Sequence, residues 1–154
     1  DLPRSRGLGD VYKRQEYVNI GMAVDTEKGL FVPVIKSADK MGVWEIAKNV
    51  LDMADKARNG ALTPNEMQGG CFTVSSLGAI GGNGFTPIVN SPEIGILGVS
   101  KAQIKPVWID SEFVPRLMLP LSLSYDHRLI NGGSAGKFLT SIVRLLSDVR
   151  TMIL

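Results

Sequence analysis

The apolar period of the chain changes along its length, and this change limits the fold more than any other sequence feature. Residues 43–59 and 133–148 repeat apolar side chains at helical spacing, whereas most of the remaining chain follows the shorter period of strands. Glycine- and proline-rich turns separate these segments. Helices and hairpin-connected strands of one chain bury their apolar faces by packing in layers. The sequence therefore predicts an α+β fold in which helices pack on a mixed β-sheet.

The first helix is expected over 43–59, with Gly60 as its C-terminal stop. A short second helix is expected to open at Thr63, which can form a capping box with Glu66. The last helix is expected over about 133–148. The apolar face of the first helix comprises Val43, Ile46, Ala47, Val50, Ala54 and Ala57, and that of the last comprises Ala135, Phe138, Leu139, Ile142, Leu145, Leu146 and Val149.

The strands are predicted from alternation and from short apolar runs. Residues 17–26 alternate with a period of two, and 30–37 follow a turn at 27–29, so the two segments are expected to form a β-hairpin. Further strands are expected at 71–76, at the end of 86–109 and over 113–126, with a glycine-rich loop at 76–85 and a turn at 110–112.

Composition excludes several classes of function. The 154 residues, 44% apolar and 21% charged, suit one globular domain, and a formal net charge of +2 does not indicate a nucleic-acid-binding surface. No run of about 18 apolar residues indicates a membrane helix. One cysteine and one histidine leave no pattern typical of a metal site or an intrachain disulfide. Residues 1–15 are basic and aperiodic, so we expect a disordered or artefactual leader, or else a linker, before a domain at 16–154.

The lone histidine, His127, lies where an expected strand ends and a glycine-bearing turn opens the last helix. Histidine is the side chain best suited to proton transfer near neutral pH, and strand-to-helix junctions project side chains into clefts. Position alone leaves a structural or merely exposed histidine as the more common alternative. The glycine-rich loop lacks the patterns of nucleotide-binding loops, and Cys71 has no local group to lower its pKa, so a structural thiol is expected there.

The segment DHRLING, residues 126–132, resembles the DHRxxDG signature of dihydrolipoamide acyltransferases, the E2 components of 2-oxo-acid dehydrogenase complexes. Further blocks resemble that family in the same order, and the resemblance covers about residues 16–154. They are NIGMAVDTEKGLFVPVIK, LTPNEMQGGCFTVSSLGAIGG, FTPIVNSPEIGILGVSK and PRLMLPLSLSYDHRLING. The resemblance implies a chloramphenicol-acetyltransferase-like two-layer sandwich, a mixed β-sheet with helices packed on one face.

The segment TVSSLG at 73–78, followed by two glycines at 81–82, resembles the acetyl-transferring type of the pyruvate dehydrogenase complex. The resemblance implies that an acetyl group passes between dihydrolipoamide, delivered by a separate lipoyl domain, and coenzyme A. His127 would act as general base on the attacking thiol, because the thiolate is the nucleophile. Ser75 would stabilise the tetrahedral oxyanion. A strand serine with a satisfied hydroxyl is the alternative for Ser75.

Asn131 stands where the signature usually has aspartate, which keeps the hydrogen-bonding capacity but not the charge. It is the third candidate catalytic residue, whereas Asp126 and Arg128 are expected to be structural. No coenzyme A contact can be named, and no metal is expected. For the apolar C-terminal residues 152–154 two expectations stay open, an assembly contact or a helix end that folds back on its own domain.

The resemblance also implies binding partners and a cellular location. We expect self-association to trimers and a larger cubic or icosahedral core, with histidine and serine facing each other across the boundary between subunits. The E1 and E3 components would bind through domains that this chain does not contain, without nucleic acid or membrane. The location would be the bacterial cytoplasm, or the mitochondrial matrix in a eukaryote.

Three alternatives stay open. One is a succinyl- or branched-chain-transferring member of the family. Another is an antibiotic acetyltransferase of the same fold, although its usual HHxxxDG motif is missing here. The third is a catalytically incomplete scaffold, because the resemblance leaves out the first part of the family's catalytic domain.

Overall fold

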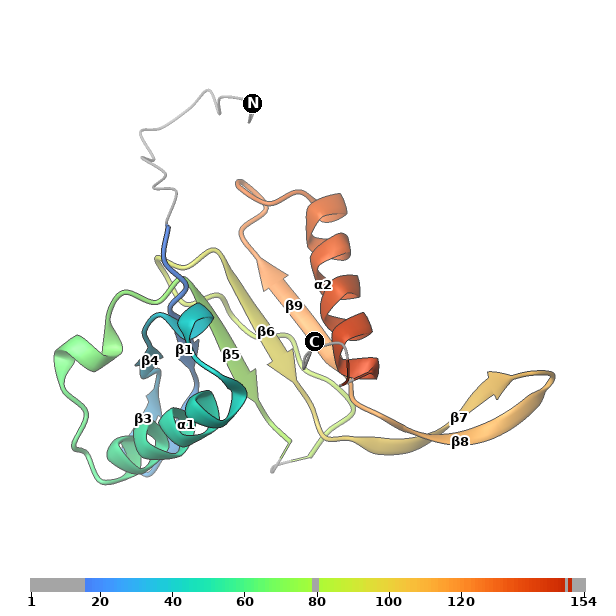
Figure 1. Ribbon diagram of the computed structural model, residues 1–154, viewed down its shortest axis with the longest axis horizontal. Helices are drawn as coiled ribbons and strands as arrows, with labels where there is room; N and C mark the ends of the chain where they lie inside the picture. Colours follow the sequence, from blue (N-terminus) through green and yellow to red (C-terminus); the bar gives the residue numbers. More distant parts are fainter. Residues whose placement is uncertain (1–15, 79–80, 149, 151–154) are drawn as a thin grey trace.

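A five-stranded mixed sheet forms the centre of the computed structural model, which describes residues 16–78, 81–148 and 150 (Figure 1). The strand order is β4-β1-β5-β6-β9. β5 runs parallel to β1 and β6, whereas β4 and β9 are antiparallel to their neighbours. The strands are β1 Ile20–Met22, β4 Val34–Ile35, β5 Phe72–Ser76, β6 Gly95–Val99 and β9 Leu121–Tyr125.

Two hairpins stand apart from the central sheet. A small one joins β2 (Val24–Thr26) to β3 (Gly29–Phe31), and a longer one joins β7 (Gln103–Ile109) to β8 (Glu112–Met118). In Figure 1 the β7–β8 hairpin projects as an arm beyond the sheet.

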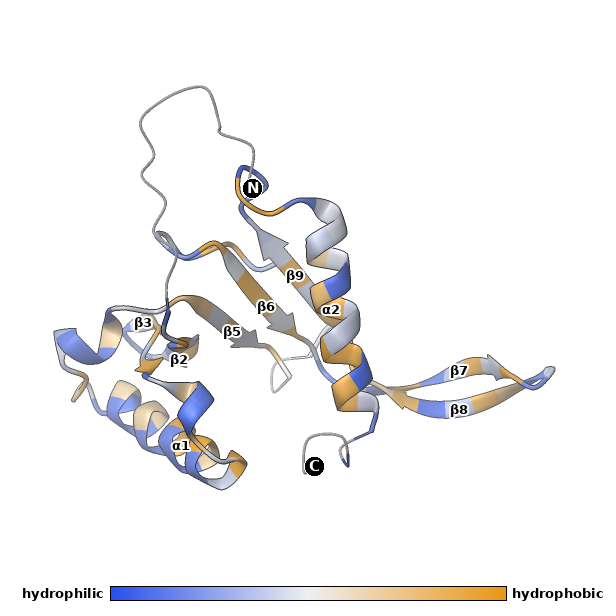
Figure 2. Cartoon of the chain, turned by 45° about the horizontal axis from the view of Figure 1, so that its top comes forward, coloured by the Kyte–Doolittle hydropathy of each residue, from blue (hydrophilic) through white to orange (hydrophobic). Residues whose placement is uncertain are grey.

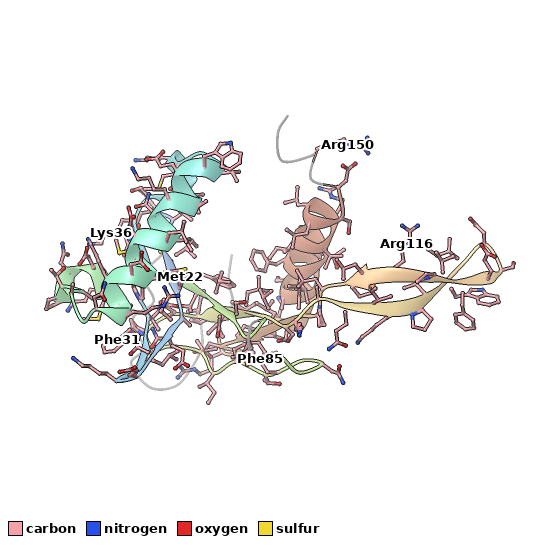
Figure 3. All side chains as sticks on the ribbon, turned by 90° about the horizontal axis from the view of Figure 1, so that it is seen from below. Met22, Phe31, Lys36, Phe85, Arg116 and Arg150 are labelled. Atoms are coloured by element: carbon pink, nitrogen blue, oxygen red, sulfur yellow. The ribbon has the colours of Figure 1, made fainter. Side chains whose placement is uncertain are left out.

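The helices α1 (Val43–Arg58) and α2 (Gly132–Ser147) lie on the same face of the sheet, above its two edges (Figure 3). α1 contacts β2 and β4, and α2 contacts β9. Two short 3-10 turns, η1 (Ala38–Lys40) and η2 (Pro64–Met67), complete the described elements. This arrangement confirms the prediction of an α+β fold with helices packed on one face of a mixed sheet. Neither helix of the described part has the length and hydropathy needed to cross a bilayer.

The helix predictions are confirmed within a residue or two. Gly60 follows α1 with a φ of 65°, a conformation that glycine adopts without strain. At η2 the Glu66 carboxylate accepts the Thr63 N–H at 2.9 Å, the reciprocal half of the predicted capping box. The predicted apolar face of α1 is only partly buried, since burial is confined to Ala54 and Ala57, which pack against Val24. Only the C-terminal half of the helix lies over the small β2–β3 sheet.

Four predicted strands were wrong in extent, because each divides between two sheets. Residues 17–26 form β1 and β2, and 30–37 form β3 and β4. The expected hairpin is nevertheless confirmed, because the pairs Thr26 with Gly29 and Ile20 with Ile35 keep one continuous antiparallel register. Pro33 lies between β3 and β4, where it has no N–H to donate to a ladder, although its carbonyl still accepts the Met22 N–H. The long strand expected in 86–109 divides into β6 and β7, and 113–126 divides at Pro120 into β8 and β9. The predictions for residues 1–15, 149 and 152–154 concern parts of the chain outside the described residues.

Candidate functional site

His127 lies in a tight turn that follows β9 and is fixed by the residue before it. The Asp126 N–H donates to the Ile94 carbonyl at 2.9 Å, and the Asp126 carbonyl accepts from Leu129 and Ile130, each at 3.0 Å. The turn is therefore bound to the start of β6 and closed upon itself. The His127 side chain is exposed on this rigid support.

The two charges that flank His127 pair with each other. The Arg128 guanidinium donates to the Asp126 carboxylate, with Nη2 and Oδ2 2.7 Å apart, and the Arg128 N–H donates to Oδ1 at 3.0 Å. These hydrogen bonds from Arg128 lower the pKa of Asp126 to about 2. This ion pair joins the residues on either side of His127 and so stabilises the turn, in agreement with the structural role expected for both residues.

Asn131 caps the helix that follows. Its Oδ1 accepts the Ser134 N–H at 2.8 Å, so it satisfies one of the free amides at the start of α2. Asparagine and aspartate both make this bond, which explains in physical terms why Asn131 can replace the aspartate of the signature. His127 and Asn131 thus belong to one turn at the amino end of α2.

Tyr125 is a neighbour of the histidine that was not among the predicted site residues. Its ring centroid lies 5.6 Å from that of His127, with the two ring planes inclined by 39°. Tyr125 is the last residue of β9, two positions before His127, and that proximity in sequence was the available signal.

Ser75 lies near the carboxyl end of β5, in register with Gly98 of β6, which is in turn in register with Ser122 of β9. Residues in register point to the same face of a sheet. A Cβ on Gly98 would meet the Ser122 hydroxyl, Phe85 and Pro87 within about 3 Å. The face that carries Ser75 is therefore the one that the loop after residue 84 crosses, opposite α1 and α2.

Two residues before Ser75, on the same face of β5, Thr73 also binds the loop that precedes β6. Thr73 is fully buried, and its hydroxyl donates to the Glu93 carboxylate at 2.6 Å. Burial raises the pKa of Glu93, although its hydrogen bonds to Thr73 and Asn90 oppose the shift. No sequence pattern marked Glu93, because its burial depends on Gly21 and Gly70, whose missing side chains leave it room.

Ser75 and His127 lie at opposite ends of the sheet in one chain. Ser75 is level with Ser122, and β9 then runs on for three residues to Tyr125, about 10 Å at the usual rise, before His127 is reached. β6 also lies between their strands, which adds about 10 Å sideways. Figure 1 shows the turn before α2 at the end of the sheet where the β5 arrow begins. A base and its partners must come within about 3 Å, so one chain does not bring the two residues together.

The remaining candidates have structural surroundings. The half-buried Cys71 donates its thiol to the Tyr17 carbonyl at 3.2 Å, in agreement with a structural thiol. Gly81 and Gly82 take φ values of 110° and 92°, which favour glycine. The described residues contain no group of three or more His, Cys, Asp or Glu side chains that could hold a metal ion.

Comparisons with known proteins agree on one family. The family model described as 2-oxoacid dehydrogenases acyltransferase (catalytic domain) matches residues 5–154 and so begins within the segment set apart as a leader. A dihydrolipoyllysine-residue acetyltransferase component of the pyruvate dehydrogenase complex from Pseudomonas aeruginosa is 58% identical over 146 residues, which are 95% of this chain and 27% of that protein.

Two solved structures share the fold. A dihydrolipoamide acetyltransferase of Azotobacter vinelandii is 55% identical with a TM-score of 0.88 over 92% of this chain and 58% of that one. The cubic core of a pyruvate dehydrogenase multienzyme complex gives the same identity, TM-score and coverage. The chain therefore spans somewhat more than half of the solved relatives and about a quarter of the full-length one.

Proposed function

The chain belongs to the acyltransferase (catalytic domain) family of the 2-oxoacid dehydrogenases, and on that premise we propose that it transfers an acetyl group between dihydrolipoamide and coenzyme A. Acetyl is favoured over succinyl or branched-chain acyl groups because the relatives reported above are acetyltransferases of the pyruvate dehydrogenase complex. The TVSSLG segment of β5 supports the same choice.

Ser75, His127 and Asn131 are the proposed functional residues. The Azotobacter vinelandii enzyme was studied for the role of a serine, a histidine and an asparagine in its catalytic mechanism, and there the histidine follows the serine by 52 positions and precedes the asparagine by 4. The same intervals separate Ser75, His127 and Asn131 in this chain. This coincidence, on a backbone that superposes closely, is the observation that carries the proposal.

The chemistry follows from the side chains. His127 removes the proton from the attacking thiol, and the thiolate adds to the thioester carbonyl. The Ser75 hydroxyl donates a hydrogen bond to the resulting oxyanion. Collapse of the tetrahedral intermediate releases the other sulfur as a thiolate, which takes the proton back from His127. The turn that carries His127 is held in place by the ion pair of Asp126 with Arg128 and by the Asn131 cap.

A second copy of the chain has to complete the site, because His127 and Ser75 lie at opposite ends of one sheet. We place His127 of one copy against Ser75 of the next, in a trimer that builds a larger core. The solved cubic core of a relative supports the larger assembly. The E1 and E3 components and the lipoyl domain are the proposed further partners. The relatives are bacterial, so we place the protein in a bacterial cytoplasm.

The test is acetyl transfer from acetyl-CoA to dihydrolipoamide, with this chain and with a form extended at its N-terminus to the length of the solved relatives. His127→Ala is expected to lower the rate about 10²–10⁴-fold, the usual contribution of a general base. Ser75→Ala is expected to lower it about 10²–10³-fold. Ser76→Ala is the matched control, because Ser76 follows on the same strand but points to the other face.

Full activity of His127→Ala would contradict the assignment of His127 as the general base. Equal losses in Ser75→Ala and Ser76→Ala would assign the effect to the strand and not to the hydroxyl. Faster turnover with succinyl-CoA or isobutyryl-CoA than with acetyl-CoA would correct the acyl group. Transfer by the extended form alone would make this chain the incomplete scaffold that is the third alternative above.

A further inference from the structure

The Glu93 carboxylate connects three strands of the central sheet. It accepts from the Thr73 hydroxyl of β5 at 2.6 Å, although Glu93 itself comes two residues before β6. A Cβ on Gly21 of β1 or on Gly70 would contact the carboxylate, so the side chain reaches across β5 to β1. Thr73 is fully buried, and without Glu93 its hydroxyl would have no water to bond to instead. Loss of this hydrogen bond is therefore costly.

The backbone around Glu93 is fixed as well. The Glu93 N–H donates to the Asn90 carbonyl at 2.9 Å, and the Asn90 side chain donates to the Glu93 carboxylate. Residues 90–93 therefore form a closed turn whose last residue is bound to β5. With its side chain and its N–H both bonded, Glu93 determines where the chain enters β6.

The residue after Glu93 holds the turn that carries His127. The Ile94 carbonyl accepts the Asp126 N–H at 2.9 Å, which extends the pairing of β6 with β9 by one step. In Figure 2 the start of β6 and the head of the β9 arrow lie at the same end of the sheet, beside the turn that leads into α2. A shift of Glu93 would therefore move the Ile94 carbonyl and, with it, the residue that precedes the histidine.

We propose that Glu93 is a positioning residue for His127, because its hydrogen bond to Thr73 fixes the Ile94 carbonyl and, through it, the turn that presents the imidazole. The effect on catalysis rests on the proposed function, whereas the link to the turn rests on these hydrogen bonds alone. A base that is displaced by about 1 Å can lose about 10²-fold in rate. The catalytic step, and not the binding of substrate, should therefore depend on Glu93.

The test measures kcat and KM of acetyl transfer together with amide hydrogen exchange. Glu93→Ala is expected to lower kcat about 10²-fold, with the KM for both substrates unchanged, and to speed exchange of the Asp126 amide. Glu93→Gln keeps an oxygen that can accept from Thr73, so it is expected to retain wild-type kcat and exchange. Mass spectrometry of a peptide that spans Asp126 gives the exchange rate without any need for catalysis.

Glu66→Ala is the matched control. The Glu66 carboxylate also accepts a threonine hydroxyl, that of Thr63 at 2.9 Å. It lies in η2, which contacts β4, the edge strand on the opposite side of the sheet from β9. The variant thus loses a comparable hydrogen bond far from the His127 turn. It is expected to keep wild-type kcat and Asp126 exchange, even where urea denaturation shows a loss of stability similar to that of Glu93→Ala.

Several outcomes would overturn the proposal. Wild-type kcat in Glu93→Ala, or a rise in KM alone, would show that Glu93 does not position His127. Equal losses in Glu93→Ala and Glu66→Ala would assign them to general stability, and an equal loss in Glu93→Gln would assign it to charge. If Glu93→Ala fails to fold, Thr73→Val, which keeps the shape and removes the donor, takes its place. An inactive wild type would refute only the proposed function, and unchanged Asp126 exchange in Glu93→Ala would still refute the link to the turn.

Discussion

Glu93 shows how a single side chain depends on distant parts of the chain. Its carboxylate accepts from the buried Thr73 hydroxyl and occupies space left by Gly21 and Gly70. Together these contacts fix the loop before β6 over the face that carries Ser75. Burial raises its pKa, which means that the folded state favours the protonated form more than the unfolded chain does.

The sign of that shift gives a pH prediction. A carboxyl with a raised pKa in the folded state contributes stability below its unfolded pKa, near 4.5, and loses that contribution as the pH rises through the folded pKa. Glu93→Gln keeps an oxygen for Thr73 and removes the charge. We expect the variant to unfold at higher urea concentration than wild type at pH 7, with the difference shrinking toward pH 4.5. A variant less stable than wild type at pH 7 would contradict the assignment.

At this scale the candidate residues could be predicted from the sequence, but their surroundings could not. His127, Ser75 and Asn131 came from short motifs that can be read directly. Glu93 did not, because the glycines that make room for it lie more than twenty positions away in sequence. The role of Asn131 as a cap became visible only when its hydrogen bond to Ser134 was located.

The elements of the chain follow local rules closely at the helices and less closely at the strands. α1 and α2 match their predicted ranges because capping and helical period are properties of neighbouring residues. The predicted strands were too long, since a continuous apolar run does not indicate where a chain passes from one sheet to another. Pro33 and Pro120 lie at such breaks, where a ladder donor is missing.

The amino end of α2 provides a prediction at the scale of an element. Asn131→Ala removes the cap and should lower the free energy of unfolding by about 1 kcal/mol. Asn131→Asp keeps the acceptor and restores the residue usual in the signature, so it should unfold like wild type and retain transfer activity. Urea denaturation of the three proteins gives the stabilities. A large loss of activity in Asn131→Asp, at unchanged stability, would show that the amide itself takes part in the reaction.

At the scale of the whole molecule, the proposed site residues are divided between the two ends of the central sheet. One chain carries Ser75 at the end of the sheet from which the β7–β8 arm leaves, and His127 at the end where α2 begins. Sequence resemblance implied a site between subunits, and the register of three strands supplies the physical reason. The arm itself was predicted only as parts of two longer strands, because its projection from the sheet depends on the breaks after Val99 and before Leu121.

The central claim, a site shared between copies, is tested most directly by producing Ser75→Ala and His127→Ala chains together and measuring acetyl transfer by the mixed oligomer. Each variant alone is expected to be nearly inactive. If the site lies between copies, random head-to-tail assembly of equal amounts pairs an intact serine with an intact histidine at about one interface in four, and about a quarter of wild-type activity returns. If the mixture stays as inactive as its components while forming mixed oligomers, both residues act within one chain and the account is wrong.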